Sequence, residues 1–213
     1  MTLYKNTVSN LLWKALIKLQ NSHEFQPFRL VGGTALSLQI GHRKSVDIDL
    51  FTDAEYGSID FNALETKLKE LFPCVEPSFS GQISMGTSYF VGNNKEELIK
   101  LDIFYTDTFV FPVVHYENIR LASIEEIIAM KLEVVGNSGR KKDFWDLHEL
   151  LDKFSLQTMF EFYFKRYPYG HSQEELLQKL LDFKEADNDF EPICFKGKIW
   201  EVIKSDFENL INQ

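Results

Sequence analysis

Apolar residues recur along the chain with two different periods. Between residues 3 and 20 they return every three or four positions, which predicts an amphipathic helix. Between residues 46 and 52 charged and apolar residues alternate, which predicts a strand. Helical spacing returns later and prevails from Ser123 onward. The pattern therefore predicts an α/β domain over residues 1–120 and an all-helical domain over residues 121–213.

Glycine, proline and capping residues mark further boundaries in the first domain. The predicted elements are a strand at 28–31, a helix at 34–40 ending at Gly41, a helix at 61–72 capped by Asp60, strands at 83–91 and 98–105 joined by a turn at 92–94, and an extended piece at 113–116. Pro73 and Pro77 are expected to break the chain between the helix and the strands.

In the second domain, Ser123 and Glu126 have the spacing of a capping box. This box predicts a helix that runs through Val135 and stops at the glycine-rich residues 136–139. The further predicted helices are at 140–153, 156–166, 173–183 and 199–211.

Three aspartates are candidates for a metal site. Asp47 and Asp49 alternate along one predicted strand, so both side chains project from the same face. Asp102 lies on a second strand and shares its face with Lys100. Hard cations bind carboxylate oxygens, and two such residues on one strand with a third on a neighbour suit a site for two Mg²⁺ ions. The same spacing is also typical of an exposed acidic face.

A glycine pair precedes the second predicted helix. Bare N–H groups at Gly32 and Gly33 are suited to receive a phosphate at the helix N-terminus, although a tight strand-to-helix turn needs the same residues. The Ser45 hydroxyl lies next to the aspartate strand. It is a candidate donor to a phosphate oxygen, and capping a turn is its alternative role.

Composition narrows the class of protein. The net charge of -9 excludes a general nucleic-acid coat, although residues 1–44 hold six basic groups against Glu24 alone. A basic region beside an acidic centre suits an enzyme that holds metal ions and a polyanionic substrate; a solvated acidic surface is the alternative. Cys74 and Cys194 lie far apart, and no signal peptide or membrane span is evident. We expect a cytoplasmic protein that does not bind membranes.

Several motifs together resemble a known family. They are GGTAL at 32–36, GHRKS at 41–45, DIDLF at 47–51, KLDIF at 100–104 and AMKLEVVGNSGRKKDFWDL at 129–147. A GG turn followed by an Asp-x-Asp pair resembles the signature of the nucleotidyltransferase superfamily. The full set, in this order, resembles the AbiEii/AbiGii toxins of type IV toxin–antitoxin and phage abortive-infection systems. The resemblance implies a nucleotidyltransferase-like first domain with a mixed sheet, and a helical second domain that completes the active-site cleft.

The resemblance also implies a role for each matching residue. Gly32, Gly33 and Ser45 would hold the nucleoside triphosphate (NTP), and Asp47, Asp49 and Asp102 would be the catalytic carboxylates and metal ligands. Lys131 would contact phosphate, and Asp143 would be a further essential acid. The candidate substrate contacts are Arg43, Arg140, Lys141 and Lys142. A buried lysine such as Lys131 needs solvent, an acid or a phosphate, and Asp143 alternatively stabilises its helix N-terminus.

These implications define one leading hypothesis and two alternatives. The first is Mg²⁺-dependent transfer of a nucleoside monophosphate (NMP) from an NTP to RNA, with tRNA as the leading acceptor, by a toxin that has a cognate antitoxin. The second keeps this chemistry and replaces the RNA by a small molecule or a protein. The third is a nucleotide-binding module without catalysis. His42 and His148 lie near the motifs, and we expect both to be surface or packing residues.

Overall fold

The computed structural model describes residues 2–78 and 85–211, within which seven strands form one mixed sheet. The sheet order is β3-β4-β5-β2-β1-β7-β6, and β2 runs parallel to β5 while β1 runs parallel to β7. The strands are β1 (Arg29–Leu30), β2 (Ile48–Thr52), β3 (Cys74–Pro77), β4 (Gly86–Asn94), β5 (Glu97–Tyr105), β6 (Val114–Tyr116) and β7 (Ile119–Leu121). The predicted mixed sheet is confirmed.

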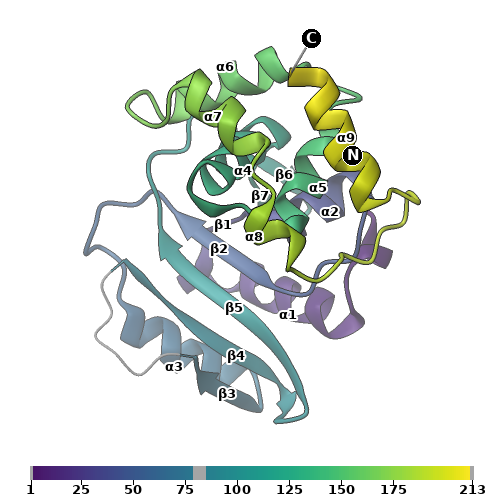
Figure 1. Cartoon of the computed structure of the whole chain (residues 1–213). Helices are drawn as coiled ribbons and strands as arrows, with labels where there is room; N and C mark the ends of the chain where they lie inside the picture. The colour runs from purple at the N-terminus through teal and green to yellow at the C-terminus, as the bar shows by residue number, and fades with distance from the viewer. Residues whose placement is uncertain (1, 79–84, 212–213) are drawn as a thin grey trace.

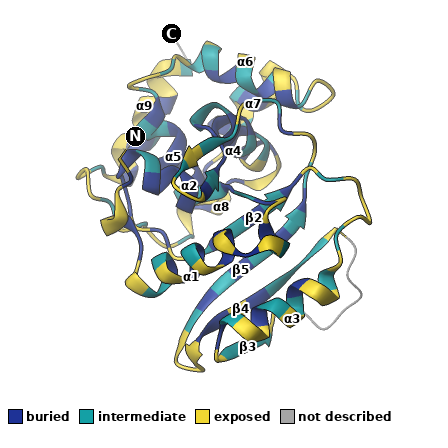
Figure 2. Cartoon of the chain, turned by 180° about the vertical axis from the view of Figure 1, so that it is seen from behind, coloured by how far each residue is buried: buried dark blue, intermediate teal, exposed yellow. Residues whose placement is uncertain are grey.

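Helices cover the two faces of the sheet unequally. Helices α1 (Asn10–Asn21) and α3 (Phe61–Leu71) lie on one face, in front of the sheet in Figure 2. Their apolar stripes are buried, with Leu12, Leu16 and Leu68 fully enclosed. The opposite face of β4 and β5 carries no helix in Figure 1. Alternate residues of β5 are accordingly buried and half-exposed, as expected for a sheet with one open face.

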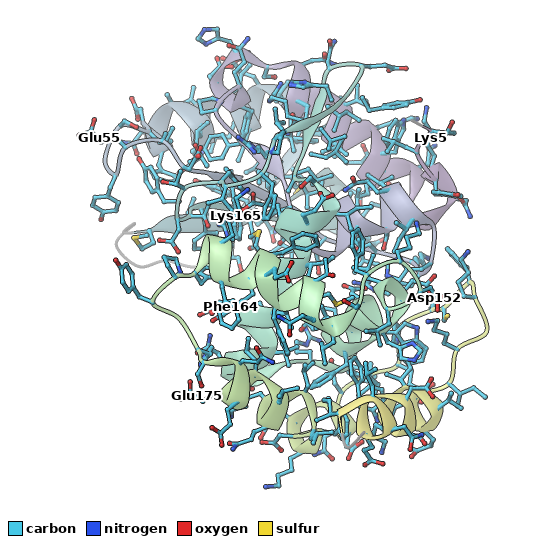
Figure 3. The ribbon with its side chains drawn as sticks, turned by 90° about the horizontal axis from the view of Figure 1, so that it is seen from above. Lys5, Glu55, Asp152, Phe164, Lys165 and Glu175 are labelled. Atoms are coloured by element: carbon cyan, nitrogen blue, oxygen red, sulfur yellow. The ribbon has the colours of Figure 1, made fainter. Side chains whose placement is uncertain are left out.

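The remaining helices gather at one end of the sheet (Figure 1). They are α2 (Gly32–Ile40), α4 (Ile124–Ser138), α5 (Lys141–Leu150), α6 (Leu156–Arg166), α7 (Gln173–Leu180), α8 (Lys184–Asp187) and α9 (Trp200–Ile211). Helix α4 is central, since it packs against α2, α5, α6 and α7. Figure 3 looks onto α6, where Phe164 and Lys165 are labelled. The Lys165 ammonium lies 4.5 Å from the ring centre of Phe111, so α6 also contacts the segment after β5.

Two predicted helix starts near the N-terminus are wrong, since α2 begins at Gly32 rather than residue 34 and α1 begins later than predicted. The first helix begins at Asn10 rather than residue 3, because the Ser9 hydroxyl accepts the N–H of Leu12 and caps it there; a short 3₁₀ turn, Lys5–Thr7, precedes it. A second 3₁₀ turn, His23–Phe25, follows the helix. The Gly41 C-cap is confirmed by its left-handed backbone, with φ at 71°.

The β-strands depart from prediction at their ends. Pro73 and Pro77 are predicted to break the chain, yet β3 follows Pro73 directly and includes Pro77, since proline is tolerated on an edge strand. The predicted hairpin turn at 92–94 is also wrong. Strand β4 continues through Asn94, whose side chain accepts the N–H groups of Glu96 and Glu97 and places the turn there. The predicted start of this strand, Ile83, lies outside the described residues.

Helix α4 continues past its predicted end at Val135. Gly136 lies inside the helix, where a Cβ would lie 2.5 Å from the imidazole ring of His171, so the close packing of this ring requires glycine. The Ser123 hydroxyl accepts the N–H of Glu126, as predicted. The Glu126 carboxylate, however, turns to the Arg166 guanidinium and to the N–H groups of Val110 and Phe111 instead of returning to the cap. It therefore joins α4, α6 and the segment after β5.

Replacing Glu126 by alanine is expected to destabilise the protein by about 3–5 kcal/mol. The side chains of Glu126 and Arg166 are both fully buried, so the substitution leaves an uncompensated charge and two backbone donors without their acceptor. Thermal and urea denaturation measure the loss. Glu125→Ala, one position earlier in the same helical turn, is the control and is expected to cost less than about 1 kcal/mol. Equal losses of stability in the two variants would show that the buried contacts of Glu126 contribute little to the fold.

Candidate active site

A cavity of about 340 Å³ lies between the open face of the sheet and helices α4 and α5. Most of the predicted site residues line it: Gly32, Gly33, Asp47, Asp49, Asp102, Lys131, Arg140, Lys142 and Asp143. Its apolar wall is formed by Val31, Phe51, Ile127, Met130 and Val134. Polar groups that converge on an apolar concave surface of this size are typical of a small-ligand site.

The carboxylates reach the cavity through the parallel pairing of β2 and β5. Asp49 and Asp102 are direct neighbours in the register of these two strands, and Asp47 precedes β2. The intervening residues, Ile48 and Leu50, are fully buried on the opposite face. Strand alternation therefore places the acids on the open side of the sheet, as the sequence predicted.

The glycine pair makes room for the charged side chains of the site. Gly32 has φ at 67°, and a Cβ there would collide with the Asp49 carboxylate. A Cβ on Gly33 would lie 2.5 Å from the Arg43 guanidinium. Both residues line the cavity at the first turn of α2, so their N–H groups lie beside the acids. Larger residues at these positions would displace Asp49 or Arg43.

Asp146 is the centre of a buried ionic cluster behind the cavity. One of its carboxylate oxygens lies 2.7 Å from His42 Nε2 and 2.6 Å from Arg43 Nε. The other lies 2.7 Å from Arg43 Nη2 and 2.8 Å from Lys131 Nζ. Lys131 also lies 2.5 Å from Asp143. The cluster, defined as His42, Arg43, Lys131, Asp143 and Asp146, joins the loop after α2 to helices α4 and α5.

Mutual attraction keeps Asp146 and Lys131 charged although both side chains are buried. Burial alone would raise the pKa of Asp146, but Arg43 and Lys131 hold it well below its usual range. Burial would likewise lower the pKa of Lys131, but Asp143 and Asp146 raise it. The Lys131 ammonium thus stays charged at the cavity wall, with a side chain that is 8% exposed.

The pKa of Asp49 is shifted in the opposite direction to that of Asp146. Partial burial and the neighbouring carboxylates of Asp102 and Asp47 raise its pKa to about 6. Asp102 is better compensated, since it accepts hydrogen bonds from Ser88 at 2.5 Å and from Lys100 at 2.6 Å. The ammonium of Lys142 lies 3.9 Å from Asp47. The three acids are therefore crowded, and an additional cation would relieve their repulsion.

The donor set suits a hard divalent cation. Asp47 and Asp49 offer carboxylate oxygens on one side of the cavity, and the Asp49 carboxylate lacks close compensation. With Asp102 held by Lys100 and Ser88, no three His, Cys, Asp or Glu side chains within residues 2–78 and 85–211 are arranged to hold a metal ion as they stand.

Three predicted site residues do not line this cavity. The Ser45 hydroxyl is 7% exposed and lies 2.8 Å from the Thr34 hydroxyl. Arg43 is bound within the cluster. Lys141 is 5% exposed, and its ammonium lies 5.4 Å from the ring centre of Trp200. Arg140 and Lys142, by contrast, reach the cavity from the start of α5, although Arg140 also binds Asp189.

No local pattern in the sequence predicts the pairing of Asp146 with His42 and Arg43. The predicted packing role of His42 is consistent with its full burial. The residue types do offer an indication of this pairing. Asp143 and Asp146 lie three residues apart on one helix face, and the motif GHRKS contains a basic pair that can balance them. Their meeting depends on the approach of segments more than 100 residues apart in sequence.

The fold is that of a nucleotidyltransferase, as comparison with known proteins shows. Residues 14–208 match the family model described as "Nucleotidyl transferase AbiEii toxin, Type IV TA system". JHP933 from Helicobacter pylori is 20% identical, with a TM-score of 0.60, over 94% of this chain and 87% of its own. MenT4, a nucleotidyltransferase toxin from Mycobacterium tuberculosis, is 12% identical, with a TM-score of 0.61, over 95% and 82% respectively.

The chain belongs to the AbiEii family of nucleotidyltransferase toxins of type IV toxin–antitoxin systems. The two solved structures share its fold. A search of curated proteins finds no match in sequence. No helix within the described residues is long and apolar enough to cross a membrane.

Asp49→Asn is expected to stabilise the metal-free protein at about pH 8. The pKa of Asp49 rises from 3.8 to about 6 on folding, so the native state binds more protons between these values. Stability therefore falls as the pH rises through this window and stays reduced above it. The difference corresponds to at most about 3 kcal/mol, and partial exposure reduces it to about 1–2 kcal/mol.

Thermal denaturation with a chelator, at about pH 8 and about pH 4.5, measures this effect. The advantage of Asp49→Asn is expected to shrink at the lower pH, because Asp49 then folds mostly protonated. Asp152→Asn, at an exposed position labelled in Figure 3, is the control. A variant less stable than the wild type at about pH 8 would show that the three carboxylates do not repel one another.

Proposed function

We propose that the protein transfers the NMP group of an NTP to an RNA acceptor, with tRNA as the leading candidate. The observation that carries this proposal is the convergence of Asp47, Asp49 and Asp102 with the Gly32–Gly33 turn in one cavity. Lys131, Arg140 and Lys142 face the same space and are suited to bind polyphosphate.

The reaction joins two substrates at the carboxylates. The oxygen of the acceptor hydroxyl bonds to the α-phosphorus, the bond from that phosphorus to the bridging oxygen of the β-phosphate breaks, and pyrophosphate leaves. The hydroxyl proton passes to a carboxylate, and we assign this role to Asp102, which lines the same cavity. Gly32 and Gly33 orient the triphosphate through backbone N–H groups, and Lys131 holds a phosphate oxygen.

Two Mg²⁺ ions would be held by Asp47, Asp49 and Asp102. Bound there, they would supply charge neutralisation at the phosphates and activation of the hydroxyl. Ser45 acts through Thr34, whose hydroxyl donates to the backbone carbonyl of Asp47 and so fixes this residue just before β2. Arg43 contributes indirectly, because it binds Asp146 in the ionic cluster. Lys141 contributes to packing, because its ammonium lies over the ring of Trp200.

The family supports a cognate antitoxin as a partner and growth arrest as the biological outcome. The net charge of -9 disfavours a large RNA surface, so a small-molecule or protein acceptor is the second candidate. A nucleotide-binding module without catalysis is the third, and the crowded carboxylates argue against it, because such crowding is unfavourable unless a cation is bound.

Incorporation of each labelled NTP into total tRNA with Mg²⁺ tests the proposal. Wild-type protein is expected to label tRNA with one preferred nucleotide. Asp47→Asn is expected to reduce the rate at least about 100-fold, because the change removes a charged ligand at the reacting phosphate. Asp152→Asn, remote from the cavity, is the matched control and is expected to retain full activity.

If label appears on proteins or small molecules in a lysate and not on tRNA, the acceptor is a protein or a small molecule rather than RNA. Full activity of Asp47→Asn would exclude the proposed carboxylate site.

A further inference from the structure

A second cavity of about 230 Å³ adjoins the first. Asp47, Arg140 and Lys142 line both cavities. A group-transfer enzyme must bring two substrates together at its reacting groups. Two cavities that meet at a candidate catalytic carboxylate provide a separate place for each substrate.

The outer wall of the second cavity is a segment without helix or strand. We call residues 188–199, between α8 and α9, the strap. The strap is bound to the loop after α2: the Lys44 N–H donates to the carbonyl of Ile193 at 2.8 Å, and the Phe195 N–H donates to the carbonyl of His42 at 2.8 Å. Arg140 adds a side-chain pair with Asp189 at 3.0 Å. The strap is therefore fixed to both sides of the cavity.

Apolar side chains on the cavity wall point to solvent. Phe190 is 90% exposed, and it lines the cavity with Val46 and Ile193, which are 61% and 60% exposed. An aromatic ring left in water at a cavity rim has no packing role, since its exposure forfeits the gain from burial. It does offer a flat surface on which a base can stack.

Basic side chains line the same cavity as this aromatic surface. Lys44 is exposed, the Arg140 side chain is 59% exposed, and Lys142 is half-buried beside Asp47. Asp189 and Glu191 also line the cavity, but Asp189 is already engaged by Arg140. An exposed ring among lysine and arginine side chains is typical of surfaces that bind single-stranded nucleic acid.

We propose that the second cavity binds the single-stranded 3′ end of the RNA acceptor. Phe190 stacks on a terminal base, Lys44 and Arg140 contact the backbone phosphates, and the terminal hydroxyl points past Lys142 to Asp47. The NTP occupies the first cavity at the same time. This inference rests on the proposed function, because it assigns the acceptor of that reaction to a surface and to a nucleic-acid form.

Binding of a fluorescein-labelled single-stranded RNA of about 12 nucleotides with a free 3′ hydroxyl tests the assignment. Fluorescence anisotropy on the full chain is expected to show a Kd about tenfold higher for Phe190→Ala and near the wild-type value for Phe190→Trp. Tyr169→Ala is the matched control, because Tyr169 is 99% exposed and lies outside both cavities. A blunt duplex of the same sequence is expected to bind more weakly than the single strand.

A second measurement separates this surface from the NTP site. The KM for RNA is expected to rise about tenfold in Phe190→Ala, whereas the KM for NTP and the thermal shift by NTP with Mg²⁺ stay unchanged. Wild-type affinity of Phe190→Ala for the RNA would overturn the second cavity as the acceptor site while leaving RNA transfer intact.

Absence of RNA binding by the wild type, with labelling of a protein that depends on Phe190, would overturn both the RNA acceptor and this assignment. The strap would then be a protein-docking surface.

Discussion

The structure depends on the buried negative charge of Asp146. Its carboxylate is fully enclosed and binds Arg43 with both oxygens, while Lys131 and His42 complete its surroundings. Removing one member of such a cluster leaves the others as uncompensated charges in a medium of low polarity. The loop after α2 and helices α4 and α5 are therefore held in one arrangement, and the ribbon around them is mostly buried in Figure 2. The same arrangement places Lys131 at the cavity wall and positions the loop that leads to Asp47.

The acidic side of the site is built by a different rule. Backbone pairing of β2 with β5 forces Asp49 beside Asp102, and the lack of a side chain on Gly32 lets the carboxylate approach α2. Paired cations relieve part of the repulsion, at Lys100 and more distantly at Lys142. The pKa of Asp49 nevertheless stays high. The crowded carboxylates attract a metal cation, and the basic residues on the cavity wall attract a polyphosphate. The site therefore complements both parts of a metal-bound polyphosphate.

The sequence predicted the elements whose signals are local. Alternation placed the acids of β2 and β5 on one face, Asp60 and Gly41 marked helix ends, and residues 156–166 form a helix with the predicted bounds. The prediction missed β3 and β7, which are too short for a periodic pattern. It also missed the partners of Asp146 and Glu126, because each charge is balanced by residues distant in sequence. The position of the strap was also not predicted. A segment without regular structure has no periodic pattern, and its position depends on hydrogen bonds to the loop after α2.

Nucleotide affinity after a charge-neutral replacement of the Arg43–Asp146 ion pair tests whether the buried cluster positions the site. Arg43→Met with Asp146→Leu removes one positive and one negative charge together, which limits the penalty for an unpaired group. Calorimetric titration with a non-hydrolysable NTP analogue and Mg²⁺, on protein shown by circular dichroism to be folded, gives the affinity. We expect at least about tenfold weaker binding than in the wild type, because Lys131 loses a partner that fixes its position. A folded double variant with wild-type affinity would show that the cluster stabilises the fold without positioning the site.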